Sequence, residues 1–538
     1  MPVQSTEHVL ARFEQLTEVG RALGRERDSA RLLEIILTSA GWLTHADGSA
    51  LYRVNEAGDA LTFEIVRNET LGWGPATRLP ADIPFPPVPL YDADGTPNHH
   101  SVVANAALSR RSTRIADAYN YAGFDFSVMR RIDASHGYRS RSVLTVPMLD
   151  QQDELLGVVQ LINARDAEGR VTEFTEEDQR LTEALTALAG VVLEKSLLID
   201  RLETLFKSFV NLINVAIDEK SPHTGGHCQR VPELTMMLAE AAHDTERGPL
   251  AAFRMSERDR GELWIAGLLH DCGKITTPVH VVDKTTKLQT IFDRISLVEA
   301  RLEILARDAR IDALERKLAG ESPAEVDAAL AATLRRLDED RAFLRHANVG
   351  QERSAAEDAI RVREIGERRW VDHAGAVQPL LTADEVENLS ISHGTLTAAE
   401  RDIINQHISS TIRMLESLPW PKHLRNVPEY AGGHHERMDG RGYPRGLTRD
   451  QMSWQARMMA IADIFEALTA GDRPYKSAKT LSESLHILGR MSVTGHIDPD
   501  LFDVFVRRKV YLAYARRFLD PELIDEIDES AVPGYTPR

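Results

Sequence analysis

Residues 434–444 of the chain read His-His-Glu-Arg-Met-Asp-Gly-Arg-Gly-Tyr-Pro. This stretch gathers two adjacent imidazoles, two carboxylates and two guanidinium groups around a Gly-Tyr-Pro turn, and few structural roles would need that mixture. A second unusual pair, His270-Asp271, closes the apolar helical run 263–269 and is followed by Cys272-Gly273-Lys274. Neutral imidazole and ionised carboxylate suit iron, manganese or zinc, whereas alkaline-earth ions prefer oxygen alone. Both stretches therefore indicate parts of one metal site.

Three more residues extend this candidate metal site. His227 lies in residues 224–231, Thr-Gly-Gly-His-Cys-Gln-Arg-Val, and His407 ends the segment 396–407. Asp463 lies in Met-Met-Ala-Ile-Ala-Asp-Ile-Phe, a helical segment that is apolar nearly all round. An uncompensated carboxylate would be costly to bury there, so a metal cation is the most favourable partner.

In these motifs the chain resembles the HD-GYP phosphodiesterases, which hydrolyse cyclic dinucleotides and above all cyclic di-GMP. The resemblance covers roughly residues 205–290 and 393–515, and it includes Arg473-Pro474-Tyr475-Lys476 as well as the segments quoted above. It implies a C-terminal all-α domain that holds two or three iron or manganese ions. The implied metal ligands are His227, His270, Asp271, His407, His434, His435 and Asp463. The family pattern makes Asp271 the carboxylate that bridges two metals.

The resemblance also implies how substrate is held and attacked. Paired cations lower the pKa of a shared water and neutralise phosphate charge, so no side-chain nucleophile is required. Asp271 and Lys274 are the implied catalytic residues, and the implied substrate contacts are Lys274, Tyr443, Arg473 and Lys476. Some family members bind a third metal through a glutamate four residues before the first motif histidine. Here that position is His223, which suits either a third-metal ligand or a solvent-facing residue of a two-metal site.

Charge is unevenly distributed along the chain. The formal net charge is −18, yet Arg437, Arg441, Arg445 and Arg449 surround the Gly-Tyr-Pro motif. An acidic enzyme needs a local basic patch to attract a dianionic substrate, although exposed arginines in a solvated loop are equally common. The strong overall acidity argues against nonspecific binding of DNA or other nucleic acid.

Length and composition indicate a large cytoplasmic protein. At 538 residues and 43% apolar content, the chain suits two or three domains with real cores. Cys228 and Cys272 cannot build a disulfide framework, and we interpret them as buried small hydrophobes in a reducing compartment. Residues 1–8 show no basic region leading into an apolar one, and no uncharged run approaches the ~18 residues of a membrane span.

The N-terminal part has the pattern of an α/β sensor. Residues 29–43 predict an amphipathic helix, and a long helix is predicted from about Glu176 onward. Alternating or apolar segments predict strands at 49–54, 60–66, 142–148 and 155–163. This order resembles a GAF domain, supported by residues 114–119 before the third strand and by Pro147 within it. Such a domain implies a small ligand of unknown identity.

A partial match to a cyclic-nucleotide-binding GAF signature leaves that ligand open. Asn163, Phe174 and Asp178 fit the signature, whereas Ala164 and Gln179 break it. A structural turn followed by a helix start explains the same residues. In that favoured interpretation, Thr175 is the helix cap and Asp178 occupies the capping-box position.

An apolar stripe connects the two parts of the chain. It consists of Leu198, Leu202, Leu205, Phe209, Leu212 and Ala216, at four-three spacing. This spacing predicts a coiled-coil seam and a parallel homodimer, although the stripe could instead pack within one subunit. Because the helix runs almost directly into His227, it could transmit a change in the sensor to the metal site.

Residues 290–392 fall outside the family pattern and are rich in Glu, Asp, Arg and Ala. With a break at residues 320–323, they predict a helical hairpin that could serve as a lid, a docking arm or a dimer element. The predicted divisions are 1–28 as an N-terminal helix, 29–190 as a GAF-like sensor domain, 191–217 as a connecting coiled-coil helix, 218–289 and 393–520 as the two parts of an HD-type domain, 290–392 as the insertion and 521–538 as a C-terminal tail.

Together these features predict a sensor-regulated phosphodiesterase that converts cyclic di-GMP to linear pGpG, GMP or both. Base recognition is not legible in the motifs, so hydrolysis of another cyclic dinucleotide such as cyclic GMP-AMP is an alternative. A catalytically silent receptor is a further alternative, but it would not need an assembled generator of hydroxide.

Overall fold

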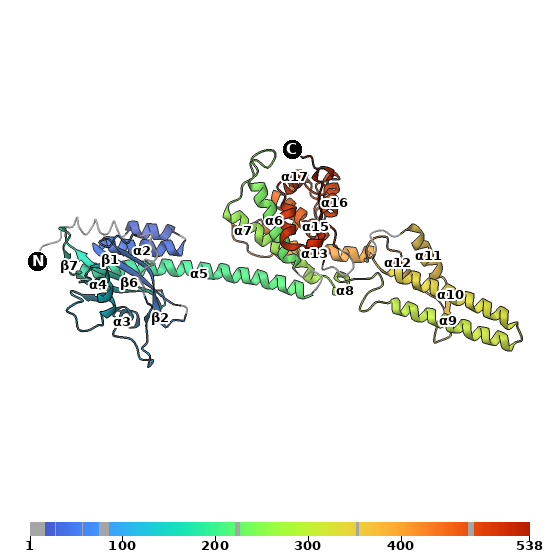
Figure 1. The fold of residues 1–538 in the computed structure, drawn as a ribbon, viewed down its shortest axis with the longest axis horizontal. Helices are drawn as coiled ribbons and strands as arrows, with labels where there is room; N and C mark the ends of the chain where they lie inside the picture. The colour runs from blue at the N-terminus through green and yellow to red at the C-terminus, as the bar shows by residue number, and fades with distance from the viewer. Residues whose placement is uncertain are drawn as a thin grey trace. The chain divides into compact units, whose positions relative to one another are not determined.

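The computed structural model describes residues 17–26, 28–55, 57–74, 86–220, 226–350, 355–471 and 478–537. The chain divides into two compact units, residues 1–206 and 207–538, and each is described by itself (Figure 1). Residues 17–25 are helical, which agrees with the helix predicted in this region as far as the described residues reach.

The first unit is built on an antiparallel sheet in the order β3-β2-β1-β6-β5-β4, with β7 also paired to β6. Its strands are β1 (Ala46–Val54), β2 (Ala60–Asn68), β3 (Val88–Pro89), β4 (Thr113–Ile115), β5 (Val143–Leu149), β6 (Leu155–Arg165) and β7 (Val171–Thr172). Its helices are α2 (Ser29–Leu43), α3 (Val102–Ser109), α4 (Ser127–His136) and the beginning of α5 (Glu176–Lys220). The predicted helix and the four predicted strands are confirmed.

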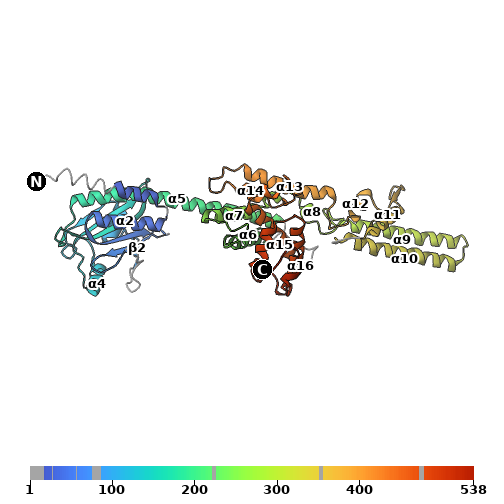
Figure 2. The ribbon, with the colours of Figure 1, turned by 90° about the horizontal axis from the view of Figure 1, so that it is seen from above.

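Side chains alternate between the two faces of this sheet, as strand geometry requires. On β1, Leu51 packs with Ile36 of α2 and Leu185 of α5 in one apolar cluster. The neighbouring residue Tyr52 belongs to a second cluster on the opposite face, together with Val103 of α3. The sheet is therefore covered by helices on both sides (Figures 1 and 2).

The residues that partly match the cyclic-nucleotide signature have structural roles. Thr175 and Asp178 form the predicted capping interaction, because Thr175 N donates to Asp178 Oδ2 at 2.8 Å and Asp178 N donates to Thr175 Oγ1 at 3.1 Å. Asn163 adopts a positive φ of 58°, and its side-chain oxygen accepts from Arg141 N at 2.6 Å. Phe174 is fully buried. The favoured structural interpretation is confirmed.

Helix α5 is continuous for 45 residues, so the predicted division at residue 190 falls inside one helix. Gly190 allows it to approach the sheet, because a Cβ there would lie 2.1 Å from the carbonyl oxygen of Leu149. Further along, five apolar residues of the predicted stripe are exposed: Leu198, Leu202, Leu205, Phe209 and Leu212.

The second unit is mostly helical. Its helices are α6 (His227–His243), α7 (Glu257–Leu269), α8 (Val279–Val282), α9 (Ile295–Leu318), α10 (Pro323–Asn348), α11 (Ala356–Gly366), α12 (Ala383–Leu389), α13 (Ala398–Glu416), α14 (Val427–Gly432), α15 (Trp454–Thr469), α16 (Leu481–Val493), α17 (Pro499–Arg507) and α18 (Val510–Phe518). Short 3-10 turns include η2 (Cys272–Thr276). The expectation of a purely helical insertion needs one correction, since β8 (Arg369–Val371) and β9 (Val377–Pro379) form a two-stranded sheet within residues 290–392.

The insertion has a core of its own. Helices α9 and α10 form the predicted hairpin and lie side by side in both ribbon views (Figures 1 and 2). Leu302, Leu344 and Val362 are buried together in its apolar cluster. At its base, the buried Lys284 ammonium donates to Asn388 Oδ1 at 2.7 Å and to the Glu400 carboxylate at 2.7 Å. These bonds tie the two ends of the insertion to α13.

Candidate metal centre

Five segments of the second unit bring the candidate ligands together. His227 is the first residue of α6, His270 and Asp271 follow α7, and Asp463 lies within α15. The remaining ligands come from α13, which carries His407, and from the turn after α14, which carries His434 and His435. All seven predicted ligands therefore meet in one place, although they span more than two hundred residues of sequence.

Asp271 lies at the centre of this group. Its Oδ2 lies 3.2 Å from His227 Nε2 and 3.1 Å from His270 Nε2, while its Oδ1 lies 3.2 Å from His407 Nε2. Asp463 Oδ1 lies 3.3 Å from His227 Nε2. The two oxygens of Asp271 thus face different imidazoles, an arrangement that suits a carboxylate shared by two cations.

Backbone carbonyl groups fix the orientation of three imidazole rings, so that Nε2 of each ring faces the centre of the site. His270 Nδ1 lies 2.7 Å from the carbonyl oxygen of Gly267, His407 Nδ1 lies 2.5 Å from that of Ile404, and His434 Nδ1 lies 2.6 Å from that of Ala431. A carbonyl oxygen can only accept, so each Nδ1 carries the proton and each Nε2 keeps a lone pair. Metal-binding histidines are oriented in this way.

Several of the atoms that could bind a metal lack a hydrogen-bond partner among the described residues. His270 Nε2, His434 Nε2 and Asp271 Oδ1 are buried without one. The short contact from His270 Nε2 to Asp271 is no hydrogen bond, because the proton of that imidazole lies on Nδ1. Buried polar atoms without a hydrogen-bond partner are rare in folded proteins and often mark a site for an ion or a water molecule. A cation would satisfy all three.

The donor atoms fall into two groups. One group is His227, His270 and Asp271, the other is His407, His434 and His435, and the donor atoms of each group lie within 4.8 Å of one another. In the second group, Nε2 of His407 and Nε2 of His435 face each other at 3.2 Å. Because Nε2 of His407 keeps its lone pair, Nε2 of His435 can either donate a proton to it or bind a cation together with it. The residues present therefore fit two metal ions.

The protonation states suit metal binding in this second group. Burial lowers the pKa of His434 well below its usual range and that of His435 to about 4, so both imidazoles are neutral. Burial raises the pKa of the Asp463 carboxyl, but the hydrogen bond and the charge of His227 outweigh it and hold the pKa well below its usual range. Neutral imidazole and ionised carboxylate are the states that metals require.

Gly273 allows the turn η2, which follows α7, to touch helix α13, which carries His407. A Cβ at residue 273 would lie 2.0 Å from the carbonyl oxygen of His407 and 2.6 Å from Thr411 N. Gly273 N donates to Thr411 Oγ1 at 2.9 Å. Only a glycine permits this approach, which places Asp271 beside His407.

Two of the four predicted substrate contacts, Lys274 and Tyr443, lie among the described residues. The Lys274 ammonium lies 2.6 Å from Asp271 Oδ2, and the Tyr443 ring stacks on His435 with ring centres 4.9 Å apart. Both residues therefore line the metal centre. The predicted substrate contacts Arg473 and Lys476, and the third-metal candidate His223, lie outside the described residues.

The expected basic patch is largely neutralised. Arg437 pairs with Asp439 at 2.8 Å, Arg445 with Glu416 at 2.7 Å, and Arg449 with the buried Asp498 at 2.8 Å. Arg449 also contacts Asp500. These guanidinium groups hold loops and helices together, so three of the four predicted arginines do not form a free anion-attracting surface.

Glu466 is a buried residue of the centre that sequence reasoning missed. Its Oε2 lies 2.5 Å from His227 Nδ1, and its Oε1 accepts from Arg230 Nε at 2.7 Å. Burial raises its pKa, but His227 and Arg230 outweigh this and hold the pKa at about 2. The ionised Glu466 thus does for His227 what backbone carbonyls do for the other histidines.

Comparison with known proteins agrees with both units. The GAF domain family matches residues 28–193, and two HD domain families match residues 224–340 and 377–501. The chain contains a GAF domain followed by an HD domain. The metal centre belongs to the HD domain, and its two matched stretches are separated by residues 341–376 of the insertion.

Curated relatives share part of the chain. A 3′3′-cGAMP-specific phosphodiesterase of Vibrio cholerae is 47% identical over 81 residues, which cover 15% of the chain and 19% of the relative. A cyclic di-GMP phosphodiesterase of Pseudomonas aeruginosa is 38% identical over 114 residues, which cover 21% and 26%. Another from Thermotoga maritima is 34% identical over 122 residues, covering 22% and 32%. The chain therefore spans about a fifth to a third of each relative.

Two further observations concern the whole chain. Both cysteines, Cys228 and Cys272, are free and buried, as predicted. Among the described helices, none is both long and apolar enough to cross a membrane.

Proposed function

We propose that the chain is a metal-dependent phosphodiesterase that hydrolyses cyclic di-GMP to linear pGpG, GMP or both. The observation that carries the proposal is the convergence of His270 Nε2, His434 Nε2 and Asp271 Oδ1, which are buried and aimed inward without a hydrogen-bond partner. The names of the Pseudomonas and Thermotoga relatives supply the substrate.

Seven residues would hold two iron or manganese ions in this centre: His227, His270, Asp271, His407, His434, His435 and Asp463. Such ions would supply the Lewis acidity that activates water and offsets phosphate charge. The chain itself orients the site, since backbone carbonyls and Glu466 fix the imidazoles. Lys274 would contact the phosphate, and Tyr443, which packs on His435, would contact the nucleotide. Arg473 and Lys476 complete the proposed substrate contacts, and His223 is the proposed ligand if a third ion binds.

A second candidate substrate is 3′3′-cGAMP. It is favoured by the relative from Vibrio cholerae, whose name specifies that dinucleotide and which is 47% identical over its matched segment. Both substrates carry the same two phosphodiester groups, so the same centre could hydrolyse either. The difference between them is one base.

Activity and metal content should be measured on the same sample. The full chain is purified without chelator after growth with added iron or manganese, and metal per chain is determined by mass spectrometry. Products from cyclic di-GMP and 3′3′-cGAMP are then separated by chromatography. We expect about two ions per chain, the number of donor groups in the centre, and cleavage of cyclic di-GMP that stops after chelation. A metal-loaded chain that binds but cleaves neither dinucleotide would instead be a receptor.

We also infer a parallel homodimer formed through α5. The apolar residues of its stripe have large exposed fractions, 63% for Leu202 and 56% for Phe209, which would be unusual for an unpartnered helix. Leu202→Glu should reduce the mass measured by light scattering from that of a dimer to that of a monomer. The matched control is Glu203→Lys, next to the stripe but not part of it. A monomeric wild-type chain would contradict this inference.

Regulation by the GAF domain is proposed through the same helix. Lys220, the last residue of α5, donates to the carbonyl oxygens of Thr277 at 2.6 Å and Lys274 at 3.3 Å. Deleting residues 1–190 should therefore leave a metal-loaded HD domain with altered turnover. Identical steady-state rates at matched metal content would leave the GAF domain a dimerisation module. Two reduced, buried thiols suit a cytoplasmic location, which we include in the proposal.

A further inference from the structure

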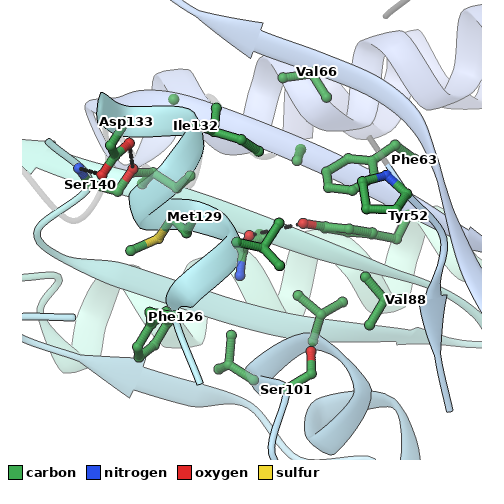
Figure 3. Close-up of a pocket in the computed structure, with 18 of the residues that line it drawn as sticks. Tyr52, Phe63, Val66, Val88, Ser101, Phe126, Met129, Ile132, Asp133 and Ser140 are labelled. Carbon is green, nitrogen blue, oxygen red and sulfur yellow. Dashed lines mark hydrogen bonds between the residues drawn. The ribbon is translucent and has the colours of Figure 1, made fainter. Parts of the chain in front are cut away.

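The GAF domain contains a cavity of about 670 Å³ between its sheet and the helices α3 and α4. The volume falls within the range of ~300–1,000 Å³ typical of small-molecule sites. In Figure 3, Phe126, Met129 and Ile132 come from α4 and its N-terminal flank, while Tyr52 and Phe63 come from the sheet. All the residues that line it belong to the first unit, so the cavity does not depend on the metal centre.

Aromatic and aliphatic side chains make up the walls of this cavity. The rings of Tyr52 and Phe63 lie 4.3 Å apart, and Tyr52 is buried. Burial raises the pKa of the Tyr52 hydroxyl, as an apolar environment does for any group that would become negatively charged. Flat aromatic surfaces of this kind favour a flat ligand, because ring stacking adds to the burial of apolar area.

The buried polar groups of the cavity satisfy one another. Asp133 accepts from Ser140 N, Ser140 Oγ and Tyr119 OH, each at 2.8 Å. Gln160 accepts from Tyr52 OH at 3.1 Å and donates to Thr145 Oγ1 at 3.3 Å. The hydrogen bonds of these side chains are formed without a charged ligand. A ligand needs only weak polar contacts with them.

The charges that line the cavity are mainly negative. Asp92, Asp125 and Asp133 line it, and Arg67 is the one arginine or lysine among the described lining residues. Arg67 is already paired with Glu69 at 2.9 Å. An anionic ligand would meet like charges and lose its hydration without a free cation to compensate it. A cyclic nucleotide carries such an anionic phosphate.

We propose that this cavity is a binding site for an uncharged, flat aromatic molecule that carries a hydrogen-bonding group, and that it excludes anionic nucleotides. The aromatic body would lie between the sheet residues Tyr52 and Phe63 and the α4 residues Met129 and Ile132. The polar group would face the amide of Gln160. This site does not rest on the proposed phosphodiesterase activity.

A matched pair of probes separates charge from shape. Naphthalene-2-carboxamide and naphthalene-2-carboxylate have nearly the same size, but only the second is charged at pH 7. Binding to the full chain is measured by saturation-transfer NMR and calorimetry, with cyclic GMP as a third probe. We expect saturable binding of the carboxamide, at least about tenfold tighter than the carboxylate, and none of cyclic GMP.

A second comparison places the probe in the cavity. Met129→Trp should fill the space and weaken carboxamide binding at least about tenfold, whereas Arg131→Trp, on an exposed position of the same helix, should not. Equal thermal midpoints of the two variants exclude unfolding as the cause. The proposal is overturned if the carboxamide does not bind, or if the carboxylate or cyclic GMP binds as tightly. Since these three tests use the wild-type chain, they decide the question even if Met129→Trp fails to fold.

Discussion

Asp133 of the GAF domain and Asp271 of the HD domain are almost equally buried, with exposed fractions of 3% and 2%. Their surroundings differ. Asp133 accepts three hydrogen bonds from a tyrosine, a serine hydroxyl and a backbone amide. Asp271 faces three imidazole nitrogens, its Oδ2 accepts from the Lys274 ammonium at 2.6 Å, and its Oδ1 has no hydrogen-bond partner among the described residues.

The comparison shows that burial alone does not identify a metal site. A buried carboxylate whose hydrogen bonds are complete stabilises the fold and needs nothing more. A buried carboxylate that keeps one oxygen without a hydrogen-bond partner, beside imidazole nitrogens that also lack one, is costly until a cation binds. The two regions therefore predict different ligands, an uncharged molecule in the GAF cavity and metal ions in the HD domain.

The largest effect is expected for Asp271→Ala. Without the carboxylate that we propose two cations share, their mutual repulsion would no longer be offset, so metal content and hydrolysis should both fall to background. Metal per chain and turnover of cyclic di-GMP are measured together. Asp402→Ala is the control, since Asp402 is exposed on the helix that carries His407. A variant with full metal and normal turnover would exclude Asp271 as a ligand.

Lys274→Ala separates substrate binding from metal binding. An ammonium cannot be a metal ligand, so the variant should keep its metal while turnover falls about 10²–10³-fold, the usual cost of losing one charge-stabilising donor. Lys422→Ala, at an exposed position, is the control. Loss of metal in Lys274→Ala would show that the ammonium mainly orients Asp271, with which it pairs at 2.6 Å.

Glu466→Gln tests a residue that contacts a ligand rather than the metal. Removal of such partners of metal-bound histidines typically weakens metal affinity about 10–100-fold. We expect that loss in a competition titration with a chelator, with turnover recovering at high metal concentration. The same titration on Glu416→Gln, an exposed glutamate, should match the wild type. Unchanged affinity in Glu466→Gln would contradict the positioning role.

Asp133→Ala should lower the stability of the GAF domain and leave the metal content unchanged, which is the opposite of the result expected for the metal ligands. Loss of the acceptor leaves buried donors unsatisfied, so the free energy of unfolding of the GAF domain should fall by about 1–3 kcal/mol. Metal content should not change. Chemical denaturation of the full chain, followed by near-ultraviolet circular dichroism, measures the effect, with Glu154→Ala as an exposed control. A loss of metal in Asp133→Ala would break the distinction between the two regions.

Asp498 is a buried carboxylate of the HD domain whose oxygens, like those of Asp133, accept hydrogen bonds from other side chains. Burial raises its pKa, but hydrogen bonds from Arg449 and Arg457 outweigh this and lower the pKa below its usual range. Because the folded pKa is depressed, Asp498 stabilises the fold above about pH 4 and loses this contribution as the pH falls through the folded pKa. The stability difference between wild type and Asp498→Asn should therefore narrow below about pH 4 and stay constant from pH 5 to 7. A pH-independent difference would contradict the depressed pKa.

Much of the metal centre could be predicted from the sequence because its ligands lie in ordered, unusual motifs. Histidine pairs and a carboxylate in an apolar helix are visible without a structure. Glu466 was missed although it lies three residues after Asp463 on the same buried helix. The signal was present, since a second carboxylate in that helix is as costly to bury as the first. Its partners, His227 and Arg230, are distant in sequence and could not be assigned.

The fold was predictable where periodicity extends over enough residues. Strands β1, β2, β5 and β6 have seven residues or more, which is enough for an alternating or apolar pattern, whereas β3, β4 and β7 have only two or three residues and carry no pattern. The ion pairs of the arginines around residue 441 could not be predicted, because the acidic partners of Arg445 and Arg449 lie 29 and 49 residues away. The cavity of the GAF domain combines residues from β1, β2, β6 and α4, which only the folded chain brings together.

The continuity of α5 constrains how the length of this protein can change. Each residue added to a helix rotates the downstream part of that helix by about 100°, whereas seven added residues restore nearly the same direction. One helix carries Leu185 of the GAF core, the exposed apolar stripe and Lys220, which bonds to the carbonyl oxygen of Thr277. A single-residue insertion between Leu212 and Lys220 would therefore put the stripe and Lys220 out of phase. Viable homologues should differ in this helix by multiples of seven residues.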